Sequence, residues 1–165
     1  MPILSKSVCS YIYLRYNSNM QILLEQIRSI IDKDIPLVSN LSNIASILYK
    51  LDNINWAGFY IANGDILYLG PFQGDVACTI IPKGKGVCGV CLERKESIIV
   101  PNVHEFKGHI ACSSLSKSEI VVPVIKDNVV KLIIDIDSPT YDRFHQEELN
   151  FLEAVSIEIA SIIQS

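Results

Sequence analysis

The feature that most constrains the fold is a change of hydrophobic period along the chain. From Met20 to Ile31, and again from Leu41 to Leu51, apolar residues recur every three or four positions, as on the buried face of a helix. Residues 55–137 instead show short apolar runs and alternation, bounded by glycine, proline and asparagine, which is typical of strands. The helical period returns near Gln146. This order predicts an α+β fold, with a central antiparallel sheet and N- and C-terminal helices packed on one face.

Proline and asparagine-glycine signals divide the chain into expected elements. Pro36 ends the first helix, because a proline forces the residue before it out of helical geometry, and Ser39 or Asn40 is expected to cap the second helix. Asn63-Gly64 predicts a tight hairpin turn. We expect strands over residues 55–61, 65–69, 76–81, 97–100, 119–125 and 129–137, a short helix over 87–94 and a final helix from about 146.

Length and composition indicate how many domains the chain forms and which classes of partner are excluded. Residues 1–17 lack a sustained period, so we expect an N-terminal arm or short helix there and a single domain over residues 18–165. The formal charge of −4 and the isoelectric point of about 5.3 argue against nucleic-acid binding. No apolar run reaches the roughly 18 residues that cross a bilayer, and no signal-peptide pattern is present. We therefore expect a cytoplasmic protein without a membrane or nucleic-acid partner.

The chain has five cysteines, an odd number at uneven spacing. Without an export signal, such a set indicates metal binding or redox chemistry rather than a secreted disulfide framework. The pairs Cys88-x-x-Cys91 and His109-x-x-Cys112 have spacings that zinc would accept. A chain of this size does not need zinc to stabilise its fold, so we expect no metal.

The redox interpretation makes Cys112 the first candidate nucleophile. It lies in a polar loop close to His109, and a nearby imidazole and hydroxyl donors lower the pKa of a thiol. Cys78 and Cys88 lie on other segments and could fold against it as partner thiols. The alternative for any one of these cysteines is burial as a small apolar residue, and periodicity does not decide between the two.

Three carboxylates and two aromatic residues form a second group of candidates. Asp135 and Asp137 are two apart in an expected strand, so their side chains leave the same face. Like charges this close are costly unless a cation or a proton meets them, although both residues are equally consistent with the end of a strand. Glu119, which opens the preceding strand, could add a third carboxylate. Trp56 and Tyr60 also share a face and either wall a pocket or belong to the core.

Four sequence blocks resemble the free methionine-(R)-sulfoxide reductases, a family built on a GAF domain. The blocks are NWAGFY (55–60), LGPFQGDVACTIIPKGKGVCG (69–89), VPNVHEFKGHIAC (100–112), and KSEIVVP with DIDSP (117–123 and 135–139). They are long, ordered and correctly spaced, so the resemblance is specific. With the two preceding helices it covers nearly everything except about the first dozen residues.

The resemblance implies a GAF fold and an enzyme that reduces the R epimer of free methionine sulfoxide, with thioredoxin as external reductant and no bound cofactor. The cysteine that matches Cys112 is the family's nucleophile, the one that matches Cys78 is its main resolving thiol, and the one that matches Cys88 is an auxiliary partner. Cys9 and Cys91 are extra to this three-cysteine pattern and inherit no role.

The resemblance also implies a substrate site. Acidic residues matching Glu119, Asp135 and Asp137 hold the substrate against aromatic residues matching Trp56 and Tyr60. The alternative function is a non-catalytic GAF module that binds or senses a small molecule, for which a nucleophile and a resolving thiol would be superfluous. GAF domains often pair through their terminal helices, so a homodimer is compatible with the sequence, which does not itself decide the assembly.

Overall fold

A six-stranded antiparallel sheet forms the centre of the protein. The computed structural model describes residues 19–108, 110 and 114–164. Within that part of the chain the strands follow the sheet order β3-β2-β1-β6-β5-β4. Their bounds are β1 (Trp56–Asn63), β2 (Ile66–Gly74), β3 (Ile80–Pro82), β4 (Ile98–Val100), β5 (Ser118–Lys126) and β6 (Val129–Ser138). Every neighbouring pair is antiparallel, which confirms the predicted sheet.

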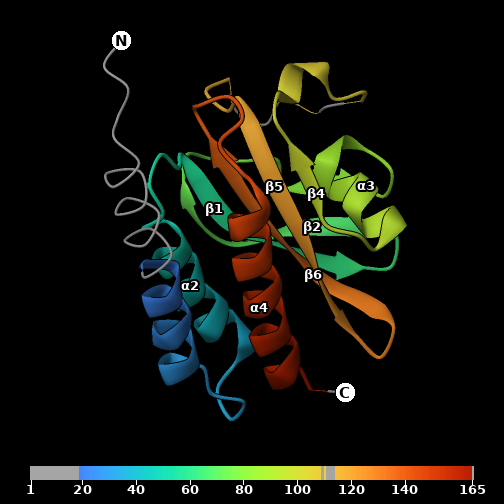
Figure 1. Ribbon diagram of the computed structural model, residues 1–165. Helices are drawn as coiled ribbons and strands as arrows, with labels where there is room; N and C mark the ends of the chain where they lie inside the picture. The colour runs from blue at the N-terminus through green and yellow to red at the C-terminus, as the bar shows by residue number, and fades with distance from the viewer. Residues whose placement is uncertain (1–18, 109, 111–113, 165) are drawn as a thin grey trace, which may run out of the picture.

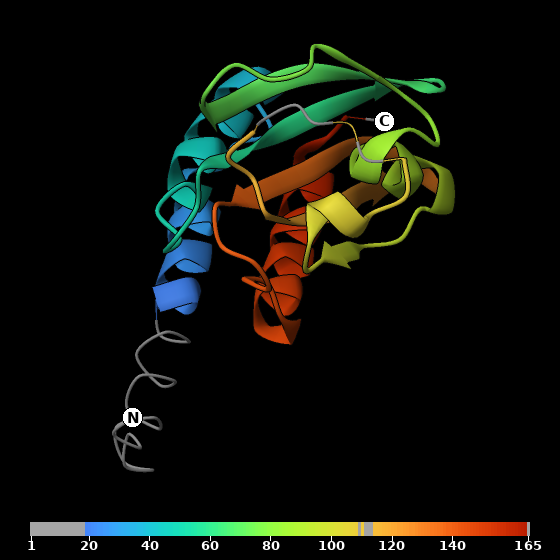
Figure 2. The ribbon, with the colours of Figure 1, turned by 90° about the horizontal axis from the view of Figure 1, so that it is seen from above.

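The helices divide between the two faces of this sheet. A first helix over residues 19–30, α2 (Leu37–Leu48) and α4 (Gln146–Ile162) pack on one face, as Figures 1 and 2 show. The short helix α3 (Gly86–Arg94) packs on the other face, near the 3-10 turn Val103–Glu105. The predicted packing of terminal helices on one face is therefore confirmed. None of the helices in the described part of the chain has the length and apolar character needed to cross a membrane.

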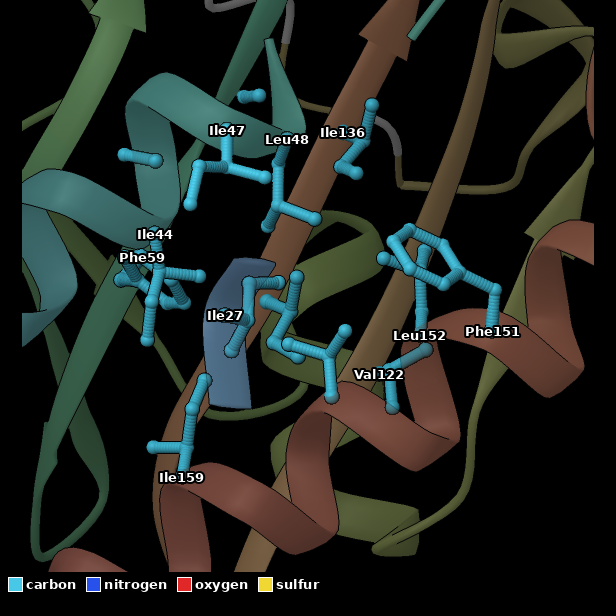
Figure 3. Packing of buried hydrophobic residues seen from close by; sticks show 14 of the residues in the cluster. Ile27, Ile44, Ile47, Leu48, Phe59, Val122, Ile136, Phe151, Leu152 and Ile159 are labelled. Carbon is cyan, nitrogen blue, oxygen red and sulfur yellow. The ribbon is translucent and has the colours of Figure 1, made fainter. Parts of the chain in front are cut away.

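Strand alternation gives the protein two separate apolar clusters. On β1, Ala57 and Phe59 join the cluster under the long helices, whereas Trp56 and Tyr60 join the cluster under α3. Figure 3 shows the first cluster, in which Ile27, Ile44 and Leu152 from three helices meet side chains of the sheet. The larger cluster packs the long helices against one face of the sheet. The opposite face, under α3, contains the smaller cluster and the pocket described below.

The second helix begins earlier than the cap prediction required. Its N-cap is Pro36, without a side-chain cap bond, so the expectation that Ser39 or Asn40 caps it is wrong. Proline already holds the φ angle that a helix entry needs, here −53°. Asn40 instead lies inside the helix, where its buried side chain accepts from the backbone N–H of Asp32 and donates to the Asp32 carbonyl.

The expected strand over residues 76–81 is only partly present. Ile80–Pro82 pairs with β2, whereas residues 76–78 have no regular structure. Gly74 adopts a φ of +125°, which glycine reaches without strain, and the chain leaves the sheet there. Side chains of β1 then bond to two carbonyl groups of the loop, those of Asp75 and Cys78.

Candidate active site

A pocket opens on the α3 face of the sheet, at the ends of β1, β5 and β6. It contains six of the eight residues that the sequence proposed for the site. Its described lining consists of Trp56, Tyr60, Val76, Ala77, Ile81, Gly86, Val87, Cys88, Ile110, Ser116, Glu119, Asp135 and Asp137. Of the remaining two, Cys78 adjoins the pocket through Tyr60, and Cys112 lies outside the described residues.

Strand register brings the acidic and aromatic side chains together. Trp56 is opposite Asp137 across the β1–β6 pair, and Asp137 is opposite Glu119 across the β6–β5 pair. Residues directly opposite each other on antiparallel strands place their side chains on the same face, so these three form one row. The next row contains Asp135, whose partner on β1 is Gly58. The absence of a side chain at Gly58 lets the Phe72 and Trp56 side chains approach each other next to this row.

The two aromatic residues position the loop that contains Cys78. The indole Nε1 of Trp56 donates to the Asp75 carbonyl at 3.1 Å, and the Tyr60 hydroxyl donates to the Cys78 carbonyl at 2.9 Å. The rings of Trp56 and Tyr60 stack with centroids 6.0 Å apart. Both residues are nearly fully buried. They thus wall the pocket and also fix the backbone next to a cysteine.

The described cysteines are in two different states. Cys78 is disulfide-bonded, whereas Cys88 and Cys91 are free and buried, so neither of these is its partner. Burial raises the pKa of the Cys88 thiol, and the charges of Asp135 and Glu119 raise it further. The same causes raise the pKa of Cys91 to about 12. At neutral pH both thiols keep their protons and are poor nucleophiles.

Burial also raises the pKa of the three carboxyls. It is the main cause for Glu119, followed by the charges of Asp135 and Asp137, and the resulting pKa lies well above the usual range. Burial and Asp135 raise the pKa of Asp137 in the same way. Burial raises the pKa of Asp135 to about 6. Hydrogen bonds with Glu119 and Cys88 lower this pKa and so offset part of the burial effect. Two carboxyls that share a hydrogen bond need one proton between them, so Glu119 and Asp135 together hold a proton that can be donated.

The central carboxylate is incompletely bonded. Asp135 is 6% exposed, yet its Oδ1 atom has no hydrogen-bond partner among the described residues. No lysine or arginine occurs in the described lining of the pocket. A buried acceptor of this kind is costly unless something bonds to it, so the site is arranged for a ligand that brings a donor or a positive charge.

The same atoms could also hold a metal ion. Cys88, Glu119 and Asp135 each direct one ligand atom to a common region, and these three atoms lie within 4.8 Å of one another. The pairing that we considered from sequence, which joined Cys88 and Cys91 to His109 and Cys112, differs from this set. Cys91 belongs to the apolar cluster under α3 and does not line the pocket.

Sequence reasoning missed two residues that shape the aromatic wall. Phe72 of β2 stacks on Trp56, with ring centroids 5.3 Å apart and an interplanar angle of 15°. Gly58 lies between them: a Cβ atom there would be 2.3 Å from Phe72 Cβ and 2.8 Å from the Trp56 ring. Both lie in the blocks NWAGFY and LGPFQGD, but the pairing of β1 with β2 was needed to connect them.

Replacing Gly58 by alanine is expected to displace this wall. The added methyl group would overlap Phe72 and Trp56, and overpacking of this kind costs about 1–3 kcal/mol. We expect a lower free energy of unfolding in urea and weaker binding of any ligand that contacts Trp56. Gly64→Asn in the adjoining turn is the control, since nothing lies within 4 Å there and asparagine tolerates its φ of +61°. Equal stability of the two variants would contradict the close packing.

Comparison with known proteins identifies the family of this chain. The GAF domain family matches residues 20–163. The chain is 42% identical to the free methionine-R-sulfoxide reductase of Escherichia coli, over 76% of this chain and 77% of that protein. It is also 42% identical to the free methionine-R-sulfoxide reductase of Saccharomyces cerevisiae, over 87% and 88%.

A solved structure extends this likeness to three dimensions. The free methionine-R-sulfoxide reductase of Neisseria meningitidis, solved in complex with its substrate, superposes with a TM-score of 0.84 at 36% identity, covering 88% of this chain and 89% of that one. A relationship of this identity and coverage, together with the shared fold, shows that the chain belongs to the free methionine-R-sulfoxide reductase family of GAF-domain proteins.

Proposed function

We propose that this protein reduces free L-methionine (R)-S-oxide to L-methionine by thiol chemistry. The observation that carries the proposal is the buried set of Glu119, Asp135 and Asp137 beside the aromatic wall, with an unpartnered Asp135 oxygen and no lysine or arginine in the described lining. Such a set needs a cationic or donating ligand. The named relatives supply the substrate class.

The proposed substrate fits the two halves of this pocket. Methionine sulfoxide is a small zwitterion with an apolar chain. Its ammonium would donate to Asp135 and Asp137, and charge-assisted bonds of this kind are the strong ones. Its methyl end would pack against Trp56 and Tyr60. Free ammonium and carboxylate groups exist only on an amino acid outside a peptide, so this geometry favours free methionine sulfoxide over an oxidised protein.

The proposed reaction begins with attack of the Cys112 thiolate on the sulfoxide sulfur. The oxygen leaves only if it is protonated, and Glu119 is the proposed proton donor because its pKa lies well above the usual range. The oxygen departs as water, which leaves Cys112 bonded to the substrate sulfur as a sulfonium. Water then attacks the Cys112 sulfur, which breaks that bond, releases methionine and leaves Cys112 as a sulfenic acid. The role of Cys112 rests on the resemblance of its sequence block, since the residue lies outside the described part of the chain.

Cys78 is the proposed resolving thiol. Its thiol would condense with the Cys112 sulfenic acid, releasing water and forming a disulfide. The oxidised state of Cys78, with Cys88 and Cys91 free, supports this choice. The hydrogen bond from Tyr60 to the Cys78 carbonyl would hold the loop in place for that step. Cys88, which lines the pocket, is the proposed auxiliary thiol.

The proposed function also includes a reductant, a cellular compartment and an assembly. Thioredoxin is the proposed reductant of the disulfide, without a bound cofactor, and the cytoplasm is the proposed compartment. A homodimer through the terminal helices is the proposed assembly. Ile22 on the first helix and Ile157 on α4 are 55% and 70% exposed, which offers apolar surface for it.

The test combines the protein with thioredoxin, thioredoxin reductase and NADPH, and supplies each free methionine sulfoxide epimer in turn. We expect NADPH oxidation with the R epimer only. Absence of turnover with the R epimer would leave the alternative, a GAF module that binds the amino acid without reducing it. Comparable rates with the S epimer or with a methionine-sulfoxide peptide would contradict the proposed specificity.

A further inference from the structure

The pocket also has the donor set of a thiophilic metal site. We propose that it binds Zn²⁺ through Cys88 Sγ and one carboxylate oxygen each from Glu119 and Asp135, and that the ion acts as an inhibitor that occupies the substrate position. The inhibitory part rests on the function proposed above. The binding part rests on the geometry alone and gives the ion no role in catalysis.

The three ligand atoms are near enough to one another to bind one ion after a small adjustment. They lie within 4.8 Å of one another, and the Cys88 Sγ and Glu119 Oε1 atoms are 4.0 Å apart. With Zn–S and Zn–O distances of about 2.3 and 2.0 Å, two tetrahedral ligands stand about 3.5 Å apart. A side-chain adjustment of a few tenths of an ångström therefore brings this pair into range. Three protein ligands leave a fourth position open to water.

A second observation points to a cation at the same place. Asp135 is 6% exposed, it lines the pocket, and its Oδ1 atom has no hydrogen-bond partner among the described residues. Glu119 is 7% exposed, and the described lining contains no lysine or arginine that could neutralise either carboxyl. A bound cation would supply the missing partner and, in place of the shared proton, would neutralise both carboxylates.

The combination of one sulfur ligand and two oxygen ligands favours Zn²⁺ over Mg²⁺ and Ca²⁺. Mg²⁺ and Ca²⁺ prefer ligand sets made only of oxygen, whereas Zn²⁺ accepts a thiolate together with carboxylates. On binding, the Cys88 thiol and the hydrogen-bonded Glu119–Asp135 pair each release one proton to solvent, and one Zn–S and two Zn–O bonds form with no change of oxidation state. The pocket thus offers Zn²⁺ a better ligand set than it offers the hard divalent cations.

Zn²⁺ and the substrate ammonium would compete for Asp135. An ion held by Glu119 and Asp135 removes the Asp135 charge that the ammonium would meet, and it also withdraws Glu119 as proton donor. Inhibition is therefore expected to be competitive, with KM rising and kcat unchanged at saturating substrate. An excess of free Zn²⁺ would lower reductase activity without oxidising any thiol.

The binding test uses the full chain with its Cys78 disulfide left intact, so that this sulfur is not a ligand. Zn²⁺ is titrated under equilibrium dialysis, and Co²⁺ replaces it as a probe whose thiolate charge-transfer absorption reports a metal–sulfur bond. We expect one ion per chain. Removal of a ligand by Cys88→Ala or Asp135→Asn should weaken Zn²⁺ binding by at least about tenfold, and Cys88→Ala should remove the Co²⁺ band.

Cys91→Ala is the matched control, because Cys91 is a buried free thiol of the same helix that does not line the pocket. It should bind Zn²⁺ like the unchanged chain. Circular dichroism confirms that each variant is folded, and Glu119→Gln replaces any variant that is not. Zn²⁺ binding that is absent, or equal in Cys88→Ala and the unchanged chain, would overturn the metal site.

The outcomes separate this inference from the proposed function. A chain that binds Zn²⁺ through Cys88 but reduces no sulfoxide would retain the metal site and refute the proposed reaction. A chain that reduces the R epimer, and whose Zn²⁺ binding does not depend on Cys88, would retain the reaction and refute the metal site. Direct binding is measured without thioredoxin, because its own thiols would also bind Zn²⁺.

Discussion

Replacing Cys112 by serine is expected to abolish reduction of free methionine (R)-sulfoxide even in the first turnover. A serine hydroxyl is not ionised at neutral pH and does not attack a sulfoxide sulfur, so no methionine should form. The expected loss is about 10⁴-fold or more, as for removal of a nucleophile in other enzymes. Single-turnover analysis measures it: the fully reduced chain is mixed with excess substrate without reductant, and released methionine is counted per chain.

Cys78→Ser is the comparison variant, because it separates loss of the resolving thiol from loss of the nucleophile. Its nucleophile is intact, so it should release about one methionine per chain and then stop or slow, because the sulfenic acid lacks its main resolving thiol. Cys91→Ala, which changes a buried thiol outside the pocket, should turn over like the unchanged chain. Loss of the first turnover in Cys78→Ser would show that the nucleophile and resolving roles are assigned wrongly.

The pairing of carboxylates could be predicted from sequence because it depends on local geometry. Asp135 and Asp137 are two apart in a strand, and period-two alternation alone places them on one face. The place of Glu119 needed only the hairpin formed by β5 and β6, which follow each other along the chain. Sequence-local contacts of this kind are the ones that a pattern can specify.

The rest of the site depends on contacts between distant segments. The sheet places β1 between β2 and β6, so that Trp56 stands opposite Asp137 and stacks on Phe72. Periodicity contains no information about that order. The strand predicted over residues 76–81 formed only at its end for the same reason, because bonds from Trp56 and Tyr60, rather than strand pairing, hold the loop before it.

Packing of α3, rather than sequence spacing, distinguishes the two cysteines of the C-x-x-C motif. Cys88 and Cys91 both lie on α3 and both face the sheet, but only Cys88 lines the pocket. A spacing of three on a helix keeps two side chains on one face while placing them a turn apart. The motif therefore indicated proximity correctly, and only the packed structure shows that one thiol is available to a ligand and the other belongs to the core.

Asp135→Asn is expected to make the protein more stable and much less active. The asparagine keeps the shape of the side chain, removes a buried negative charge and adds an N–H donor between Glu119 and Asp137. We expect the free energy of unfolding at pH 8 to rise by about 1–2 kcal/mol, a gain typical of removing strain that an active site maintains for function. Urea denaturation measures this change.

The pH dependence tests the cause of that gain. The pKa of Asp135 is raised from its usual 3.8 to about 6, so between these values the folded protein holds a proton that the unfolded chain has lost. The contribution of this carboxyl to stability is therefore present below pH 4 and is lost as pH rises through about 6. Asp135→Asn should remove this loss, so its advantage over the unchanged chain should be small at pH 4 and full above pH 7.

The same substitution should raise KM and lower kcat/KM for free methionine sulfoxide. Truncating one partner of a buried charge pair costs about 2–5 kcal/mol, so a fall of about 30-fold or more in kcat/KM is expected. Asp65→Asn is the control, because its carboxylate pairs with Lys83 on the surface and its loss should change neither quantity by much. A variant at Asp135 that is both less stable at pH 8 and fully active would refute the argument, since the carboxylate would then support the fold instead of the substrate.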